Sequence, residues 1–528
     1  MTRAERRWCV VYALLLMIVT TVPIWLAFHS AGSDWHFSGF LLAVEDGNSY
    51  IAKMNLGANG AWLFRSPYTA MPQHGTLAFL PYLLLGKLAA PPELHLQLVL
   101  LFQLFRLAAI PVLVLAVYRL SALVSTRQAT RRWATVLATA GGGLGWVLAL
   151  TGNGQWLGSL PLDFISPESF GFLALLTLPH LILARALVLW ALVDYLQPVG
   201  SGLKSYRGGL LLACAALVQP LATLVVFALV PAHQLLLWLR AGRPVLRSWW
   251  AASGPVVARL LLPSVPLLLY FAAGSLIDPY LRIWAAQNQL PSPHPLHYLL
   301  AYGLALPFAA LAALRAWRAN QPAGLLLVAW IVLLPLLAYF PYPVQRRLPE
   351  GIWIAFSLLA MQGLGSLQQG HRRRAWYQPA LVGVSLLSSM ALLAGSVGVA
   401  RKPSRPAFLT SGDEAAFAWL AGHASSGEVV LASRETGNAL PAWAPLRVIA
   451  GLGPESAGQE QLLPQIDSFY DSGMDEAERA AFLETQSIEW VVYGPLEAGH
   501  GTWNPARLGL ELEYDRSDYR IYRVGGGS

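Results

Sequence analysis

The sequence predicts a polytopic α-helical membrane protein that ends in a soluble α/β domain. Of its 528 residues, 55% are hydrophobic and only 12% are charged, whereas soluble proteins carry about 25% charged residues. Apolar runs of 18 residues or more recur along residues 1–400, and runs of this length can cross a bilayer as helices. The composition changes near residue 401, where the balance of charge reverses.

The apolar runs predict about eleven transmembrane helices. The first of them follows Arg3, Arg6 and Arg7, as a signal peptide would. It lacks a small-x-small cleavage site and is long enough to span, so we expect it to be retained. The expected spans are 9–28, 94–118, 132–150, 169–196, 208–219, 221–239, 253–275, 297–317, 322–340, 350–368 and 378–400.

One further apolar segment, residues 76–90, is too short to cross comfortably, because a helix rises 1.5 Å per residue and the hydrocarbon layer is ~30 Å thick. If it lies along the outer surface, 17 Lys and Arg residues fall inside, among them Lys204 and Arg372–Arg374, against six outside. The positive-inside rule favours this arrangement. It places the amino terminus in the cytoplasm, a long first outer loop at 29–93, and residues from 401 onward outside the plasma (inner) membrane.

The acidic residues of the membrane region fall mostly on the predicted outer face. Acids contribute little to topology, so their segregation needs another cause. Either the outer loops are simply solvated, or they carry a reaction centre. The outer acids are Asp34, Glu45, Asp46, Glu93, Asp163, Glu168, Asp278 and Glu350.

The carboxyl-terminal region has the composition of a soluble domain. Residues 1–400 hold 26 Lys/Arg and 10 Asp/Glu, whereas residues 401–528 hold 10 and 18. We therefore divide the chain into a transmembrane domain, 1–400, an outer-face α/β domain, 401–524, and a probable linker scar, 525–528. We expect the α/β domain to fold independently. Its predicted elements are helices at 413–423 and 476–486, strands at 428–433, 447–451 and 490–494, and a hairpin at 510–524.

Short motifs lie in the outer loops and the adjoining spans: EDGNSY (45–50), QHGTLAFLPYLLLG (73–86), LFRLAAI (104–110) and TLPHLILARAL (177–187). A first span, an early acidic motif, surface helices and a second acidic site resemble the GT-C superfamily of membrane glycosyltransferases. The resemblance implies a polyprenyl-phosphate-linked sugar donor, a glycan, lipid or protein acceptor, and a reaction at the outer membrane face.

By this resemblance Asp46 is the candidate catalytic base, and Glu45 competes with it for that role. Glycosyl transfer needs a base for the acceptor hydroxyl and a stabilised leaving phosphate. Adjacent carboxylates point apart on a helix or strand, so only one is expected to face the reaction. Alternatively, the pair caps a helix or belongs to a solvated loop.

Outer-face cations are the candidates for binding the carrier phosphate. The stretch PVQRRLPEG places Gln345, Arg346 and Arg347 in a short outer loop, and the guanidinium fork suits phosphate. Contact with a lipid headgroup, or an ion pair with Glu350, is the alternative.

Asp163 and Glu168 lie on the second acidic loop and flank Pro167. Either could bind a divalent metal or orient the acceptor. The alternative for Glu168 is that it merely interacts with a helix dipole.

His74, at the start of the surface helix, is a further candidate ligand for substrate.

Among the polar residues inside the predicted spans, three bear on function. Arg106 is functional by default, because a charge at that depth is costly, unless it has a structural partner. His180 is a candidate carrier ligand, although a lone buried histidine is more often structural. Arg185 is expected to snorkel to the inner face.

Taken with the resemblance, the sequence predicts a membrane glycosyltransferase with lipid and a polyprenyl-phosphate-linked sugar as partners, and no nucleic acid. A divalent metal is the one cofactor left open. The alternatives are a lipid-glycan transporter or flippase, and a non-catalytic scaffold whose outer domain binds a partner.

Overall fold

The computed structural model describes residues 1–197, 206–368, 375–501 and 503–525, so Lys204, Arg372–Arg374 and most of the expected linker scar lie outside the described residues. The chain separates into two compact units. The first, called the helical unit, contains Met1–Thr21, Phe105–Phe271 and Leu290–Gly395. The second, called the mixed unit, contains Val22–Leu104, Ala272–Gln289 and Ser396–Ser528.

Helices α1, α4, α13 and α19 each contain a boundary between the two units. The helices that lie wholly or partly in the helical unit are α1 (Arg3–Ser30), α4 (Leu94–Val124), α5 (Gln128–Ala140), α6 (Gly145–Leu150), α7 (Leu162–Ile165), α8 (Gly171–Thr177), α9 (Pro179–Tyr195), α10 (Arg207–Val218), α11 (Pro220–Arg240), α12 (Leu246–Leu261), α13 (Val265–Ile277), α15 (Pro295–Tyr302), α16 (Leu306–Arg318), α17 (Pro322–Ala338), α18 (Ile352–Leu367) and α19 (Tyr377–Ala400).

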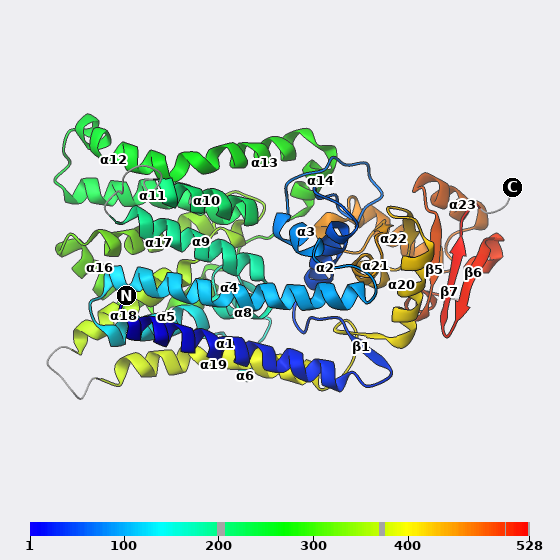
Figure 1. Cartoon of the computed structure of the whole chain (residues 1–528), viewed down its shortest axis with the longest axis horizontal. Coiled ribbons are helices and arrows are strands. Elements are labelled where there is room, and N and C mark those ends of the chain that lie inside the picture. The colour runs from blue at the N-terminus through cyan, green and yellow to red at the C-terminus, as the bar shows by residue number, and fades with distance from the viewer. Residues whose placement is uncertain (198–205, 369–374, 502, 526–528) are drawn as a thin grey trace. The chain divides into compact units, whose positions relative to one another are not determined.

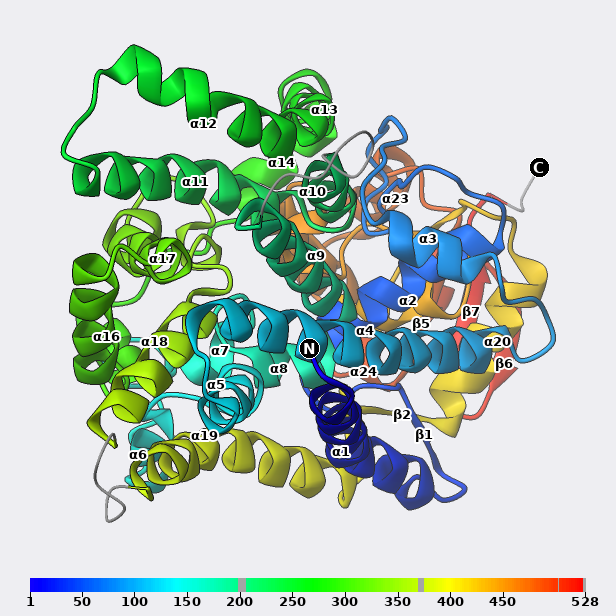
Figure 2. The same cartoon turned by 60° about the vertical axis from the view of Figure 1, so that its left-hand side comes forward.

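Helix α18 is the most enclosed helix of the long apolar set. Helices α5, α16 and α17 pack against it, and α9 packs on α10 beside α11 (Figures 1 and 2). Almost every residue of α18 from Ile352 to Gly365 is buried. Its sequence, IWIAFSLLAMQGLGSL, is apolar on all faces, as expected of a helix surrounded by others.

Several of the expected spans are broken rather than continuous. The span 132–150 divides into α5 and α6 at Gly141–Leu144. Glycine is needed there, because a Cβ on Gly143 would lie 2.5 Å from the carbonyl oxygen of Ala301. The span 169–196 divides into α8 and α9 at Leu178, since Pro179 lacks an N–H and begins a new helix.

The expected number of eleven spans remains a prediction. Six helices in the described ranges are long and apolar enough to cross a membrane, or seven if the pair α15 and α16, bent by 78°, counts as one span. Helices α10 and α17 are apolar but short, with 12 and 17 residues. A multi-pass membrane protein is therefore supported at this coarser level.

The mixed unit contains a sheet with helices around it. Its strands are β1 (Trp35–Phe37), β2 (Phe408–Thr410), β3 (Val429–Leu431), β4 (Arg447–Val448), β5 (Trp490–Tyr493), β6 (Glu511–Arg516) and β7 (Tyr519–Arg523). Its helices are α2 (Val44–Ala58), α3 (Leu80–Gly86), α14 (Pro279–Gln287), α20 (Ser411–His423), α21 (Arg434–Ala439), α22 (Gln459–Tyr470), α23 (Glu476–Thr485) and α24 (Pro495–Ala498), with 3₁₀ turns at Leu440–Ala442, Gly453–Glu455 and Pro505–Leu508.

The main sheet has the strand order β4-β3-β5-β7-β6. Strand β3 pairs in parallel with β4 and β5, and β7 pairs antiparallel with β5 and β6. These elements match the helices, strands and hairpin expected from residues 413–524. Strands β1 and β2 form a separate antiparallel pair that joins the first loop to the carboxyl-terminal region (Figure 2).

The first loop also shares a hydrophobic core with the carboxyl-terminal region. Ala52 and Tyr68, both from the loop, are buried in one cluster with Phe417, Val430 and Ile521. Composition placed a boundary at residue 401, whereas contacts group residues on both sides of that boundary in one unit. The reason is that burial of apolar surface does not depend on position along the chain.

Candidate functional site

The acid pair of the first loop lies in the first turn of α2. Glu45 and Asp46 are both exposed, and α2 begins after Ala43, which has a left-handed backbone (φ 50°) and supplies no side-chain cap. Arg434, at the start of α21, donates from Nη2 to both carboxylate oxygens of Glu45, at 3.2 and 3.0 Å. Glu45 is therefore held by an ion pair with Arg434.

Further along, α2 is fixed by buried polar contacts. Asn48 donates to the side-chain oxygen of Asn438 (2.9 Å), and Asn438 donates to the backbone oxygen of Glu45 (3.3 Å). Lys53, which is fully buried, pairs with Glu455 at 2.7 Å and also donates to Ser49. Asn48, Asn438 and Lys53 thus each have a partner, as burial requires.

The negative charges of this region act on Tyr68. Burial, and then the carboxylates of Glu455, Asp46 and Glu45, raise the pKa of Tyr68 well above its ordinary value. Its hydroxyl therefore stays protonated and donates to the carbonyl oxygen of Asn438, at 3.1 Å.

His74 is held by Asp278. The backbone N–H and the ring Nδ1 of His74 both lie within hydrogen-bond distance of Asp278 Oδ2, at 3.0 and 3.1 Å. Asp278 Oδ1 accepts from the Leu281 N–H and caps α14. Burial would raise the pKa of Asp278, but the hydrogen bonds from His74 and Leu281 outweigh it and lower the pKa below its ordinary value. The His74 side chain is 88% exposed.

In the helical unit, Glu168 meets the arginine pair. Arg347 Nε lies 3.1 Å from Glu168 Oε1, whereas Glu168 Oε2 is buried without a partner among the described residues. The Nε–H of Arg346 is also buried and lacks an acceptor there. The side-chain oxygen of Gln345 accepts from the Ser292 N–H (3.1 Å), so Gln345 has a structural role.

Arg185 corrects two expectations. It is 2% exposed and donates from Nε to Glu350 Oε1 at 2.7 Å, so it does not snorkel to the inner face. Its Nη2 also donates to the backbone oxygens of Pro167 and Glu168, at 2.7 and 2.5 Å. Glu350 is therefore a partner of Arg185, and the alternative of an ion pair between Glu350 and Arg346 or Arg347 is not among the ion pairs of the described residues. The partner of Arg185 is decided by tertiary packing, which places α9 beside the segments that carry Glu168 and Glu350.

Asp163 is a buried structural carboxylate. It accepts from Ser388 Oγ (2.5 Å) and from the Gly145 N–H (3.1 Å). A Cβ on Gly145 would lie 2.0 Å from Asp163 Oδ1, so the glycine run beside it makes room for this side chain. Burial raises the pKa of Asp163, and the hydrogen bonds from Ser388 and Gly145 offset part of the effect.

Arg106 and His180 are enclosed by the fold. Arg106 is fully buried and donates to the hydroxyls of Thr20 and Thr21 and to the carbonyl of Leu175, at 2.8–3.2 Å. It therefore has the structural partners that were the alternative to a carrier site. His180 is buried. It is the second residue of α9, because the expected span is broken just before Pro179.

Sequence reasoning missed the partners of these residues. Asp278 precedes a proline at the start of a helix, which is a recognisable N-cap signal. The residues next to Arg434 and Lys53 in the sequence do not indicate which acids these cations contact. No three His, Cys, Asp or Glu side chains of the described residues come together as a metal site.

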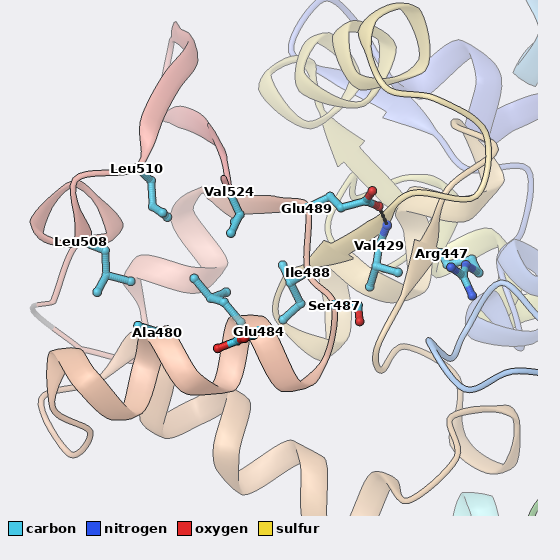
Figure 3. A pocket seen from close by; sticks show the side chains of 11 residues that line it. Val429, Arg447, Ala480, Glu484, Ser487, Ile488, Glu489, Leu508, Leu510 and Val524 are labelled. Carbon is cyan, nitrogen blue, oxygen red and sulfur yellow. Dashed lines mark hydrogen bonds between the residues drawn. The ribbon is translucent and has the colours of Figure 1, made fainter. Parts of the chain in front are cut away.

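A cavity of about 490 Å³ lies beside the main sheet (Figure 3). Leu483, Ile488 and Leu510 line it together with other apolar side chains. Two of its polar residues have partners in the sheet, since Glu489 accepts from the Val429 N–H and Arg447 donates to backbone oxygens, and the side chains of Glu484 and Ser487 also line the cavity.

No protein-family model matches the chain, and no curated protein matches its sequence. Solved structures do match its fold. The archaeal oligosaccharyltransferase AglB from Archaeoglobus fulgidus, in complex with an inhibitory peptide and a dolichol-phosphate, is 12% identical, with a TM-score of 0.55 over 93% of this chain and 70% of that chain. The same enzyme tethered with an acceptor peptide gives 13% identity and a TM-score of 0.52, over 92% and 69%.

The arabinofuranosyltransferase AftD from Mycobacteria is 17% identical, with a TM-score of 0.58. The alignment covers 99% of this chain but 40% of the AftD chain. All three structures are of GT-C membrane glycosyltransferases. The chain therefore has the GT-C fold, which confirms the resemblance seen in the sequence.

Proposed function

We propose that the protein is an integral membrane glycosyltransferase that moves a sugar from a polyprenyl-phosphate carrier to an acceptor hydroxyl at the outer face of the plasma membrane. The GT-C fold supports this reading, and one structure with the same fold holds a dolichol-phosphate. The observation that carries the proposal is the arginine pair before α18, in which Arg346 keeps a buried Nε–H with no acceptor in the described part of the chain.

A buried donor without an acceptor is costly, by about 1–3 kcal/mol. A phosphate oxygen would supply the acceptor and an opposite charge at once, and guanidinium–phosphate hydrogen bonds are among the strong ones. Arg347, which is 37% exposed on its side chain, would add a second cation. Arg185 would support the site indirectly, since it holds the Glu168 backbone next to Glu350.

Asp46 is the proposed base. It would take the proton of the acceptor hydroxyl while the acceptor oxygen bonds to the anomeric carbon. The bond between that carbon and the phosphate oxygen breaks, and the carrier leaves as polyprenyl phosphate. Asp46 is chosen by the resemblance, and Glu45, whose carboxylate pairs with Arg434, remains its competitor.

Asp163 and Glu168 do not fit a shared metal site. Asp163 Oδ2 is bound by Ser388 and Gly145 and Glu168 Oε1 by Arg347, and no third His, Cys, Asp or Glu of the described residues joins the two carboxylates as a metal-binding group. We derive no step through a metal. Of the remaining candidates, His74 stays a proposed substrate ligand because its side chain is exposed, whereas Arg106 and His180 are enclosed.

The deciding experiment is transfer of labelled sugar from a polyprenyl-phosphate donor by the purified protein in lipid, with an acceptor extract. Transfer supports the proposal. Carrier that binds and crosses the bilayer without chemical transfer would instead favour a transporter, and neither binding nor transfer would favour a scaffold.

The proposal includes a cytoplasmic amino terminus and an outer carboxyl-terminal region. Cysteine labelling of intact cells tests this in a Cys214→Ser background, since Cys214 is exposed and Cys9 is buried. An impermeant reagent should reach a cysteine at position 45 and fail to reach one at position 127.

A further inference from the structure

Helix α2 lies at the carboxyl ends of the parallel strands, which is the place where such sheets usually bind ligands. In open α/β sheets, ligands bind outside the carboxyl ends of the parallel strands. Here, α21 follows the end of β3, the turn Gly453–Glu455 follows β4, and both hold α2 through side-chain contacts. The remaining parallel strand, β5, leads into α24, where Glu497 accepts from the N–H groups of Ser433 and Gly494.

The first turn of α2 depends on these contacts more than the rest of the helix. Helix amino termini carry four N–H groups without helical partners, and they need a cap. Ala43 supplies none. Asn48 and Lys53 are anchored one and two turns later by buried partners, whereas Glu45 is held by an exposed ion pair with Arg434 and by Asn438, which donates to its backbone oxygen.

Arg434 is poorly placed to stabilise its own helix. It lies at the first position of α21, where the positive end of the dipole disfavours a cation. Ser433 already caps that helix by accepting from the Thr436 N–H. The guanidinium instead reaches Glu45, beside the proposed base.

We propose that Arg434 is a positioning residue, which holds the first turn of α2 so that Asp46 keeps one orientation in the transfer reaction. This inference rests on the proposed function. The carboxyl-terminal α/β region then supports the candidate base. It does not bind a ligand of its own at the carboxyl ends of its parallel strands. An exposed ion pair contributes little to stability, so loss of Arg434 should change orientation without unfolding the protein.

The test compares Arg434→Ala, Arg434→Lys, Glu45→Gln and the double variant Arg434→Ala/Glu45→Gln in the full-length protein in lipid. Arg447→Ala is the matched control, because Arg447 also ties this region to the first loop, through the Ala70 carbonyl, but does not touch α2. One readout is kcat and KM for the lipid-linked sugar. The other is hydrogen exchange at the Gly47 amide, which donates to the Ala43 oxygen in the first turn.

We expect Arg434→Ala to lower kcat about 10- to 100-fold with KM unchanged, as small misplacements of catalytic groups do. Arg434→Lys should retain more turnover, and the double variant should be no worse than Arg434→Ala alone, since both remove one interaction. The Gly47 amide should exchange faster in Arg434→Ala than in Arg447→Ala.

Equal exchange and equal kcat in Arg434→Ala and Arg447→Ala would overturn the inference, even with an active wild type. Independent, multiplicative losses in the double variant would also overturn it. If the wild type transfers no sugar, the proposed function fails, and the exchange measurement alone decides whether Arg434 orders the first turn of α2.

Discussion

Lys53 donates a hydrogen bond from Nζ to Oε1 of Glu455 over 2.7 Å, and both side chains are almost completely buried. Lys53 belongs to the first loop and Glu455 to the carboxyl-terminal region. Ser66, also in the loop, donates to the other carboxylate oxygen of Glu455, at 3.1 Å. A buried charge needs its partner in place, so these segments depend on each other.

The isolated fragment 405–524 should therefore fail to unfold cooperatively, although composition alone suggested independent folding. It loses Ala52 and Tyr68 from its core and leaves Glu455 without Lys53. Thermal unfolding followed by circular dichroism checks this. The matched fragment carrying Glu455→Gln should be more stable than the unmodified one; a sharp transition in the unmodified fragment would contradict the expectation.

Arg185→Met should destabilise the full-length protein by about 3–5 kcal/mol, because it strands the buried Glu350 carboxylate. The double variant Arg185→Met/Glu350→Leu should recover most of this loss. Thermal unfolding in lipid or detergent measures both. Arg240→Met is the control, since Arg240 is only partly buried and donates to backbone oxygens. Simple additivity of the two single effects would show that the residues are not coupled.

Asp46→Asn should lower turnover about 10²- to 10⁴-fold while carrier binding is kept, because the amide preserves shape but cannot accept the proton. The Gly47 amide should exchange as in the wild type, which separates loss of a base from loss of position. Steady-state transfer kinetics and carrier binding check this. Near-normal turnover in both Asp46→Asn and Glu45→Gln would remove the acid pair from the reaction.

Arg346→Ala should weaken binding of polyprenyl phosphate about 10- to 100-fold, as expected for loss of one charge-assisted hydrogen bond. Equilibrium binding in lipid nanodiscs measures the change. Arg282→Ala is the control, because it removes an exposed cation that is also predicted to lie on the outer face. An equal loss in both variants would point to general attraction of anions rather than to a phosphate site.

Asp278→Asn should remove a pH-dependent part of stability. Because the folded-state pKa of Asp278 is below its ordinary value, the carboxylate stabilises the fold above about pH 4. That contribution is lost as the pH falls through the lower, folded-state pKa. Unfolding midpoints of wild type and variant between pH 7 and pH 3 should converge at the acid end, whereas a constant difference would assign the effect to shape alone.

The class of protein and the local elements were predictable from the sequence. The apolar runs at 9–28 and 94–118 appear as α1 and α4, and the periodic patterns after residue 410 appear as the expected helices and strands. The GT-C resemblance rested on short motifs, and the fold confirms it. These features depend on composition, period and local backbone chemistry, which neighbouring residues determine.

The roles of individual charges were decided by the tertiary structure. Sequence reasoning named Asp46 as the base and Glu45 as its competitor, and only the folded chain places Arg434 against Glu45. It sent Arg185 to the inner face, although packing places it against Glu350. A charged side chain is assigned its role by the partner that compensates its burial, and that partner is distant in sequence. The sequence alone therefore determined which segments are apolar and which elements they form, whereas only the folded chain determined which charges meet.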